Sequence, residues 1–504
     1  MLTHLRVDGF KNLIGVDLYF GPFTCVAGAN AVGKSNLFDA ILFLKALMDV
    51  PILDAAMAVR DEHGAVSDIR HLFTQTPSGI CLPICIEAEI LVPPTGSDYL
   101  DQPAEAKTTF LSYRIKLEYR APNGHGARPR VELVEESLDY IKKSEAHAHL
   151  PFDHSVKWRD TVVQGRRTSP YISTEIQEDD TRVIKLHQDT STGGGRTRLF
   201  QAEKLPRTVL STVNAQESPT AVLARQEMLN WRPLQLEPSA LRMSDGFDAP
   251  AQLSPNGAHL PATLYRLAQQ WKEEDSTRQP RDQEGEAQMP DQQREGFALT
   301  QIANRLCELI DHVGAVRIDR DEKRELLTLL LTDQYGTELP AKALSDGTLR
   351  FLALASVEID PTLTGLICLE EPENGIHPER IGAIIGLLRD IAVDPSLAVG
   401  DDNPLRQVII NTHSPIVVGQ VPDESVIFAV PEQRIVAGQV IKGVSFRCLS
   451  GTWRAQDKVG MRTLQKGRAL AFLQPVAEKG DASRKGGDRR VIDREDMIQM
   501  KLEL

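Results

Sequence analysis

The sequence lacks the uninterrupted apolar run that a membrane-spanning helix requires. No uncharged apolar stretch reaches the roughly 18 residues needed to cross a bilayer. The opening segment, "MLTHLRVDGF", has no basic stretch followed by an apolar core. We therefore expect a soluble, cytoplasmic chain that makes no contact with a membrane.

Positive charge is also in deficit, since the 504 residues carry a net charge of −13. This balance argues against a protein that coats nucleic acid over its whole surface, and leaves room only for a local basic groove that contacts DNA. Hydrophobic residues make up 41% of the chain and charged residues 25%, as in an ordinary globular protein large enough for two or three cores.

Cysteines and apolar heptads are scarce. Only Cys81 and Cys85 lie close together among the six cysteines, and "CLPIC" has neither the spacing nor the second half of a common zinc site. We expect all six thiols to be reduced. Ten prolines fall between residues 155 and 300, where no apolar heptad persists, so a long coiled coil is excluded.

The patterns that are present predict an α/β protein with four regions. Residues 1–155 contain a strand hairpin, a buried strand, a glycine-rich turn, an apolar helix and further strands, which together predict a β-rich lobe. Residues 156–297 are irregular and include a polar segment, 272–296, that we expect to be flexible. Residues 298–430 predict an α/β lobe, and residues 431–504 form a C-terminal extension.

The stretch "CVAGANAVGKSN" matches the pattern G-x-x-x-x-G-K-[ST] between an apolar strand and an apolar helix. In this pattern backbone N–H groups face phosphate oxygens, the lysine reaches the β- and γ-phosphates, and the serine hydroxyl binds Mg²⁺. The alternative is a glycine-rich turn with a surface lysine. We expect ATP and Mg²⁺ to bind here, and the candidate residues are Gly28, Asn30, Gly33, Lys34, Ser35 and Asn36.

Two acids follow a second apolar strand in "GLICLEEPENGIHPER". Open α/β sheets place their chemistry at the carboxyl ends of strands. Glu370 is the candidate ligand of Mg²⁺, and Glu371 is the candidate base that orients or deprotonates the attacking water. The alternative is a solvated strand end.

A third apolar strand, "QVIINTHSP", ends at His413, and "LSDGTLRFLALAS" begins an apolar helix at Ser345. The imidazole of His413 could donate a hydrogen bond to a γ-phosphate, or it could simply cap or fill the core. Ser345, Asp346 and Gly347 would cap the helix, whose first N–H groups form an anion site.

The order of these elements resembles that of a known family. "FKNL", "GANAVGKSN", "LSDGTLRFLAL", "EEPENGIHP" and "NTHSP" together resemble the ATP-binding-cassette (ABC) type ATPases of the overcoming-lysogenization-defect, RecF and structural-maintenance-of-chromosomes kind, filed among AAA-type proteins in prokaryotes. The motifs cover roughly residues 1–75 and 300–420. The resemblance implies an ABC-ATPase head with a β-rich N-terminal lobe and a RecA-like α/β lobe, which closes on two ATP molecules as a head-to-head dimer.

The resemblance also implies roles for single residues. Glu371 would be the catalytic carboxylate and His413 the switch histidine. Glu370 stands where the family usually has aspartate, which leaves Mg²⁺ binding possible and turnover less certain. Ser345 and Gly347 would contact the ATP held by the other subunit.

Two further positions are less constrained by their pattern. Lys11 and Asn12 would lie near the nucleotide, although a plain hairpin turn explains them equally well. The glutamine that usually links Mg²⁺ to the β-rich lobe has no clear counterpart, and Gln75 is the candidate.

The leading functional hypothesis is the sensor and motor subunit of an anti-phage defence system that controls a separate effector, with a nuclease as the candidate effector. About 90 residues follow His413, too few for the family's C-terminal nuclease domain, and the acids of "VIDREDM" are expected to be solvated. The basic segment 479–490 would contact phosphate or a partner, or only solubilise the chain. The alternatives are a RecF-like DNA-repair ATPase that binds DNA directly, and a nucleotide-gated scaffold that does not hydrolyse ATP.

Overall fold

The computed structural model describes residues 1–59, 68–122, 129–189, 197–278, 296–307, 313–436 and 438–465, with residues 467, 469 and 472. Contacts divide the chain into two units, Met1–Thr463 and Leu464–Leu504, and the helices and strands with described bounds belong to the first unit. Residues 279–295 of the segment predicted to be flexible, and the predicted tail segments 479–490 and 491–497, lie outside the described residues.

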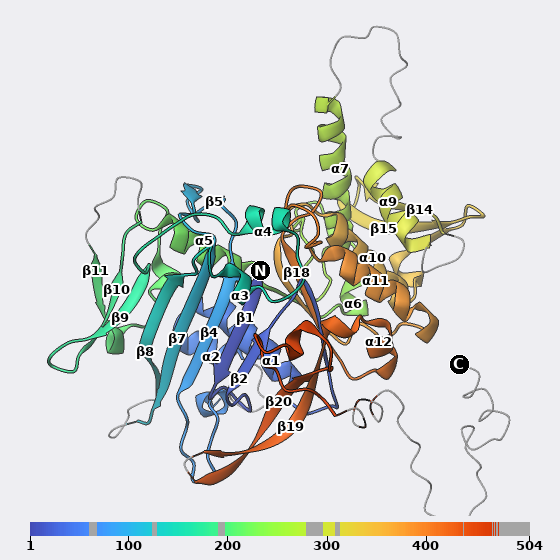
Figure 1. Cartoon of the computed structure of the whole chain (residues 1–504). Helices are drawn as coiled ribbons and strands as arrows, with labels where there is room; N and C mark the ends of the chain where they lie inside the picture. Colours follow the sequence, from blue (N-terminus) through green and yellow to red (C-terminus); the bar gives the residue numbers. More distant parts are fainter. Residues whose placement is uncertain are drawn as a thin grey trace, which may run out of the picture. The chain divides into compact units, whose positions relative to one another are not determined.

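The first unit contains an eight-stranded antiparallel sheet, spread across the left half of Figure 1. Its strands alternate buried and exposed residues because one face packs on the core and the other meets solvent. In spatial order they are β11 (Arg198–Gln201), β10 (Arg182–Leu186), β9 (Ile172–Ile176), β8 (Arg130–Tyr140), β7 (Phe110–Arg120), β4 (Ile84–Leu91), β1 (Leu2–Asp8) and β2 (Val16–Tyr19).

A second sheet has six strands and is parallel except at one edge. Its central strands are buried along their whole length, as expected for strands covered on both faces. The order is β12 (Arg232–Leu234), β17 (Gly365–Glu370), β18 (Arg406–Thr412), β3 (Phe23–Ala27), β19 (Val426–Val436) and the antiparallel β20 (Gln439–Cys448). This arrangement confirms the predicted α/β class.

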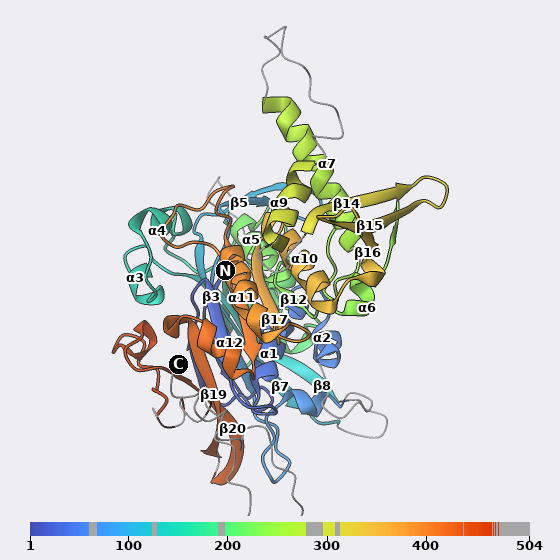
Figure 2. The same ribbon diagram turned by 90° about the vertical axis from the view of Figure 1, so that its right-hand side faces the viewer.

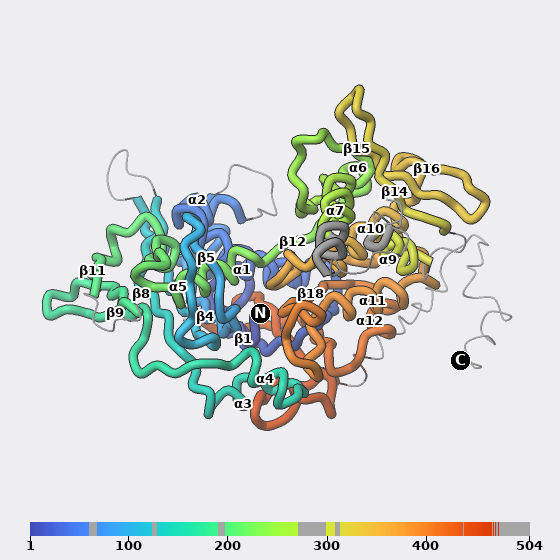
Figure 3. The backbone as a smooth tube through the Cα atoms, turned by 90° about the horizontal axis from the view of Figure 1, so that it is seen from above, coloured from blue at the N-terminus to red at the C-terminus, as the bar shows by residue number. Residues whose placement is uncertain are grey.

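Helix α1 (Lys34–Leu47) connects the two sheets through one hydrophobic core. The core contains Leu5 and Ile86 of the first sheet, Phe38 and Leu44 of α1, and Ile409 of the second sheet. Figure 3 shows α1 between the strands of the first sheet and β18. Because α1 is covered on more than one side, its sequence is apolar nearly all round, as the sequence predicted.

The remaining elements pack around these sheets. Helices α10 (Asp346–Ile359) and α11 (Ile381–Ile391) contact each other, and α11 packs on β18 (Figure 2). A small sheet joins β13 (Asp245–Gly246), β15 (Leu326–Asp333), β14 (Val313–Asp321) and β16 (Glu338–Pro340), and β5 (Thr95–Ser97) pairs with β6 (Pro103–Glu105). The other helices are α2 (Ile52–Ala58), α3 (Ala146–His149), α4 (Val156–Val162), α5 (Pro219–Leu229), α6 (Pro238–Leu241), α7 (Leu260–Arg278), α9 (Gly296–Cys307) and α12 (Pro415–Gln420).

Two sequence expectations can be compared with the described residues. All six cysteines are free, as predicted. Residues 272–278, at the start of the segment expected to be flexible, continue α7, and Gly296 begins α9. Among the described helices, none combines the length and the apolarity that crossing a membrane would require.

Candidate nucleotide-binding site

Three loops meet at the carboxyl edge of the second sheet. β3 leads into the glycine loop (Gly28–Ser35), β17 leads into the acidic loop (Glu370–His377), and β18 leads to His413. The register places Glu370 beside Asn411 and Thr412 beside Ala27, so the strands end level with one another. Parallel strands direct their carboxyl ends to one edge, which explains why residues more than 300 positions apart share one site.

The glycine loop ends at the N-terminus of α1. Gly33 is the N-cap and has a φ of 116°, in the left-handed region that favours glycine. A Cβ at this position would lie 2.4 Å from Nδ2 of Asn12, so a larger residue does not fit. Because Gly33 has no side chain, it offers no acceptor to the first N–H groups of α1, and these groups suit an anion.

Lys34 folds back over the glycine loop. Its Nζ donates hydrogen bonds to the carbonyl oxygens of Gly28, at 2.8 Å, and Ala29, at 2.7 Å, and the residue is only 6% exposed. Burial lowers the pKa of Lys34 below its usual value, and the nearby charges of Glu371, Glu373 and Glu370 oppose that shift without cancelling it. Lys34 therefore lies within the field of the acidic loop.

Lys11 and Asn12 lie in a turn that also contacts the glycine loop. Nδ2 of Asn12 donates to the carbonyl of Val32 at 2.9 Å, and its Oδ1 accepts from Nδ2 of Asn36 at 2.9 Å. Nζ of Lys11 pairs with Oδ2 of Asp39 on α1 at 2.8 Å. The sequence left a hairpin turn and a place beside the nucleotide as alternatives, and the structure has a turn that packs against the glycine loop.

Glu371 sits in a strained and well-defined conformation. Its φ is 46°, and its N–H donates to the carbonyl of Asn411 at 2.9 Å. Oε1 lies 2.9 Å from Nδ1 of His413, and Oε2 accepts from Nδ2 of Asn374 at 2.9 Å. Burial alone would raise the pKa of Glu371, but these two hydrogen bonds and the charge of Lys34 outweigh it, so the pKa falls below its usual value.

A third acid, Glu373, was missed by the sequence reasoning. Oε1 accepts a hydrogen bond from the hydroxyl of Thr412, and Oε2 is buried without a hydrogen-bond partner among the described residues. An unpaired buried carboxylate oxygen is costly, which marks the position as one suited to a donor from a ligand or its hydration shell. The signal was present, because "EEPE" contains three acids in four residues.

The N-terminus of α10 adjoins the acidic loop from another side. Ser345 is exposed, and its hydroxyl accepts from the N–H of Thr348 at 3.2 Å, which confirms the predicted cap. A Cβ on Gly347 would lie 3.1 Å from the carbonyl oxygen of Gly375, so the helix start and the acidic loop are in close contact.

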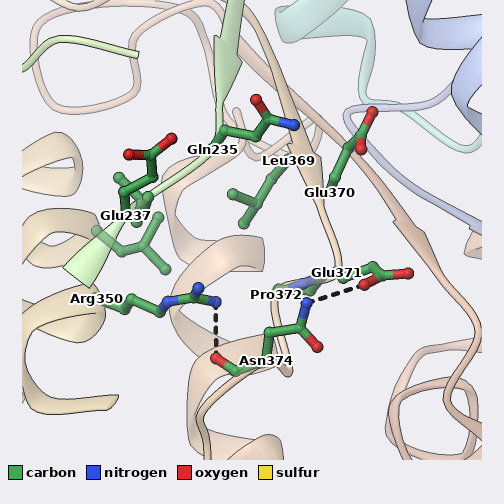
Figure 4. Close-up of a pocket in the computed structure, with 10 residues that line it drawn as sticks. Gln235, Glu237, Arg350, Leu369, Glu370, Glu371, Pro372 and Asn374 are labelled. Carbon is green, nitrogen blue, oxygen red and sulfur yellow. Dashed lines mark hydrogen bonds between the residues drawn. The ribbon is translucent and has the colours of Figure 1, made fainter. Parts of the chain in front are cut away.

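Figure 4 shows a pocket of about 330 Å³ between α10 and the end of β17. Glu370 and Glu371 point away from the strand end, and Arg350 reaches in from α10. The segment after β12 closes the opposite wall with Gln235 and Glu237. The sequence gave no indication of Arg350, Asn374 or this wall.

Ser35 and Glu370 carry oxygen atoms of the kind that Mg²⁺ prefers. Ser35 is exposed at the start of α1 and has a hydroxyl, and Glu370 ends β17 with a carboxylate. Among the described residues, no cluster of three or more histidine, cysteine, aspartate or glutamate side chains could hold a metal. Mg²⁺ typically takes one or two protein ligands together with phosphate oxygens, so the assignment of these two residues stays a prediction.

Gln75 follows a segment, Leu72–Thr74, that is hydrogen-bonded to Lys11. The N–H of Lys11 donates to the carbonyl of Leu72 at 2.9 Å, and the hydroxyl of Thr74 donates to the carbonyl of Lys11 at 2.6 Å. The side chain of Gln75 donates to the carbonyl of Arg70 at 3.0 Å. Its assignment as a metal ligand stays a prediction.

A family model described as "AAA domain, putative AbiEii toxin, Type IV TA system" matches residues 139–419, more than half of the chain. The chain belongs to this AAA family. The matched part of the AAA chain contains Ser345, Glu371 and His413, and the glycine loop precedes it. The predicted resemblance to AAA-type, ABC-like ATPases is thereby confirmed at the level of the family.

Solved structures similar to this AAA chain include three heads of structural-maintenance-of-chromosomes (SMC) proteins. The Smc head bound to the C-winged helix domain of ScpA is 12% identical (TM-score 0.43; 89% of this chain, 98% of that chain). The Smc head with an extended coiled coil, bound to the C-terminal domain of ScpA from Pyrococcus furiosus, is 11% identical (0.39; 89% and 96%). The SMC head domain from Thermotoga maritima is 10% identical (0.34; 88% and 97%). No curated protein matches the chain.

Proposed function

We propose that this protein binds and hydrolyses ATP, and that it dimerises head to head on two ATP molecules. The observation that carries the proposal is the meeting of the glycine loop, the acidic loop and His413 at one edge of the second sheet. A phosphate-binding loop beside a carboxylate would provide both phosphate binding and a group that orients the attacking water.

Each residue of the site has a defined task in this reaction. Lys34 would exchange its bonds to the carbonyls of Gly28 and Ala29 for oxygens of the β- and γ-phosphates. Glu371 would orient the attacking water and take its proton, and His413, which contacts Glu371, would donate to the γ-phosphate. Mg²⁺ held by Ser35 and Glu370 would neutralise phosphate charge.

One feature of the acidic loop supports hydrolysis rather than binding alone. The two oxygens of Glu371 are held by His413 and Asn374, so the carboxylate already has a fixed orientation toward a water beside it. Because the lowered pKa makes Glu371 a weaker base than a free carboxylate, its orientation and not its basicity supports the assignment.

The exposed start of α10 supports the dimer. Ser345 lies at the surface, and its hydroxyl and the first N–H groups of α10 form an anion site that a second subunit's ATP would fill. Closing two such sites buries two nucleotides between the subunits. ATP binding would then favour the dimer, and hydrolysis would release it.

In the cell we propose that the ATP cycle controls a separate effector protein, a nuclease being the leading candidate, in an anti-phage defence system. The family description reads "putative AbiEii toxin, Type IV TA system", and a toxin–antitoxin system has two components, which fits a chain that acts with a separate partner. In this role the chain would be the sensor and motor, and the separate effector would carry out the response.

The variant Glu371→Gln tests catalysis and dimerisation together. Gln keeps the shape of the side chain and removes the base, so ATP should bind, stay intact and trap the dimer, as measured by light scattering and by a phosphate-release assay. Adding Ser345→Arg should return the trapped protein to monomers, and the ATP affinity of the monomer should stay unchanged.

Three results would contradict parts of this proposal. Hydrolysis by Glu371→Gln at the wild-type rate would remove the catalytic assignment. An assembly state indifferent to ATP and to Ser345→Arg would remove the shared-nucleotide dimer. A wild-type protein that binds ATP and never hydrolyses it, even with its effector present, would be a nucleotide-gated scaffold.

A further inference from the structure

The catalytic carboxylate is held on two sides by side chains of different origin. His413 follows β18 and contacts Oε1 of Glu371, whereas Asn374 belongs to the acidic loop itself and donates to Oε2. The N–H of Asn374 also donates to the carbonyl of Glu371 at 3.1 Å, which closes a turn. Figure 4 shows the bond from Nδ2 of Asn374 to Oε2 of Glu371 as a dashed line near Pro372. Asn374 therefore fixes the orientation of the carboxylate.

Arg350 ties the same turn to α10. Its Nη1 donates to the carbonyl oxygen of Asn374 at 2.7 Å, as the second dashed line of Figure 4 shows. Nε of Arg350 is buried and has no hydrogen-bond partner among the described residues. Burial lowers the pKa of Arg350, and the charge of Asp346 opposes the shift. Among the described residues, the guanidinium of Arg350 therefore makes its hydrogen bond to the backbone carbonyl of Asn374.

A second contact links the two segments closer to the helix start. Gly347 packs so tightly against Gly375 and Ile376 that a Cβ would lie 3.1 Å from each of them. The first turns of α10 therefore touch the acidic loop at Gly347 and again at Arg350. A displacement of the start of α10 would therefore act on the acidic loop through these two contacts.

We infer that Asn374 is the positioning residue for Glu371, and that Arg350 couples the position of α10 to the position of Asn374. The inference rests on the proposed function, in which Ser345 binds the ATP of the partner subunit. A phosphate drawn against Ser345 would shift α10, and Arg350 and Asn374 would set the carboxylate that acts on the ATP in the chain's own glycine loop. ATP bound at one site then regulates hydrolysis at the other.

Asn374→Ala tests the positioning role. The single-turnover rate of ATP hydrolysis should fall about tenfold, while the affinity for ATP changes less than about twofold, because the amide contacts the base and not the nucleotide. The acid limb of the rate profile should move to higher pH, since a hydrogen bond that favours the carboxylate is lost. An unchanged rate and an unchanged acid limb would overturn the assignment.

Arg350→Ala tests the link to α10. The rate should fall, and the Hill coefficient for ATP should drop to about 1, because the two sites lose their connection. Arg350→Lys, which keeps one donor and the charge, should restore part of both. Arg305 pairs with Glu358 near the other end of α10, so Arg305→Ala is the matched control and should keep rate and Hill coefficient. The inference fails if Arg305→Ala and Arg350→Ala behave alike.

A measurement without hydrolysis separates this inference from the proposed function. The carboxyl carbon of Glu371 can be followed by NMR with ¹³C-labelled glutamate, and the signal assigned by its loss in Glu371→Gln. At neutral pH its chemical shift should move in Asn374→Ala, which removes the hydrogen bond from Nδ2 of Asn374 to Oε2, and also in Arg350→Ala, which frees the carbonyl of Asn374. If the wild type hydrolyses no ATP, the proposed function fails while this signal still decides the positioning. A chemical shift unchanged in both variants would overturn the inference even in an active enzyme.

Discussion

Two helices begin at the candidate site, and their N-termini are built in opposite ways. α1 starts after Gly33, which has no side chain and a left-handed backbone, so its first N–H groups receive no cap from that residue. α10 starts after Ser345, whose hydroxyl accepts from Thr348 within the same helix. The start of α1 therefore has no side-chain cap, whereas the start of α10 is capped by Ser345.

This difference indicates how each end meets an anion. The open end of α1 would accept a phosphate without displacing a side-chain cap, because Gly33 provides none. The capped end of α10 is stable alone, and an incoming phosphate adds to a helix start that already exists. The first suits permanent binding in one subunit, and the second suits a contact made only when subunits meet.

Removing the lysine of the open end should have the largest effect. Lys34→Ala should weaken ATP binding by more than about 100-fold, because the side-chain cation aimed at the β- and γ-phosphates is lost. Lys45 lies on the same helix and donates to the carbonyl of Trp231 at 2.7 Å, so Lys45→Ala is the control. Nucleotide titration should show near wild-type affinity for Lys45→Ala. Equal affinity in the Lys34 variant would remove the glycine-loop assignment.

Matched glycine substitutions compare the two ends directly. At Gly33, alanine meets a φ of 116° and the side chain of Asn12, so Gly33→Ala should weaken ATP binding by more than about tenfold. Gly347 is helical, and an alanine Cβ there would lie 3.1 Å from the carbonyl oxygen of Gly375, a tight contact that displaces the acidic loop and not the glycine loop, so Gly347→Ala should weaken the dimer and leave the ATP affinity of the monomer nearly unchanged. Titration and light scattering distinguish these outcomes, and the reverse pattern would contradict the comparison.

The acidic loop lies between the two helix starts, and the stability that it contributes should depend on pH. The pKa of Glu371 lies below its usual value of 4.5 in the folded protein, so this group contributes stability above that value and loses the contribution as pH falls through the folded pKa. Chemical denaturation should show Glu371→Gln losing less stability than wild type as the pH drops below about 4.5. The difference should be small, because the side chain is 33% exposed. Parallel stability curves would contradict it.

Loss of the cap should have the smallest effect. Ser345→Ala should lower the free energy of unfolding by about 1 kcal/mol, since one hydrogen bond to the first turn of α10 is lost. Ser345→Thr keeps the hydroxyl and should restore most of it. ATP affinity of the single chain should not change in either variant. Thermal unfolding measures the first two effects, and a drop in monomer ATP affinity would show that α10 contacts the nucleotide of its own chain.

Local sequence patterns predicted the segments that form the candidate site, whereas residues 156–297, which were expected to be irregular, contain α4–α7 and β9–β13. The strands at β3, β17 and β18 and the helices at α1 and α10 follow from apolar runs between turn residues. The glycine loop was predicted from the spacing of Gly28, Gly33, Lys34 and Ser35, which is the spacing typical of a phosphate-binding loop. Strands β9–β11 were not predicted, because their pairing with β8 depends on partners distant in sequence and not on local pattern.

The same limit explains which site residues were missed. Glu371, His413, Lys34 and Ser345 stand at the ends of recognisable elements, so their positions could be inferred from the sequence. Glu373 could have been noticed only as a third acid. Asn374 and Arg350 carry no pattern of their own, because an amide in a loop and an arginine on a helix are common in any sequence.

The sequence by itself therefore determined the chemistry available to this protein: a glycine loop with Lys34, acids at a strand end, and a serine at a helix start. These features are local, and short-range sterics and hydrogen bonding fix them. Only the tertiary structure decided which of them meet. Parallel pairing of β3, β17 and β18 brings their carboxyl ends to one edge, and the packing of α10 against the acidic loop places Arg350 on Asn374. Such contacts join residues far apart in the chain, so they depend on how whole elements pack and not on any short stretch of sequence.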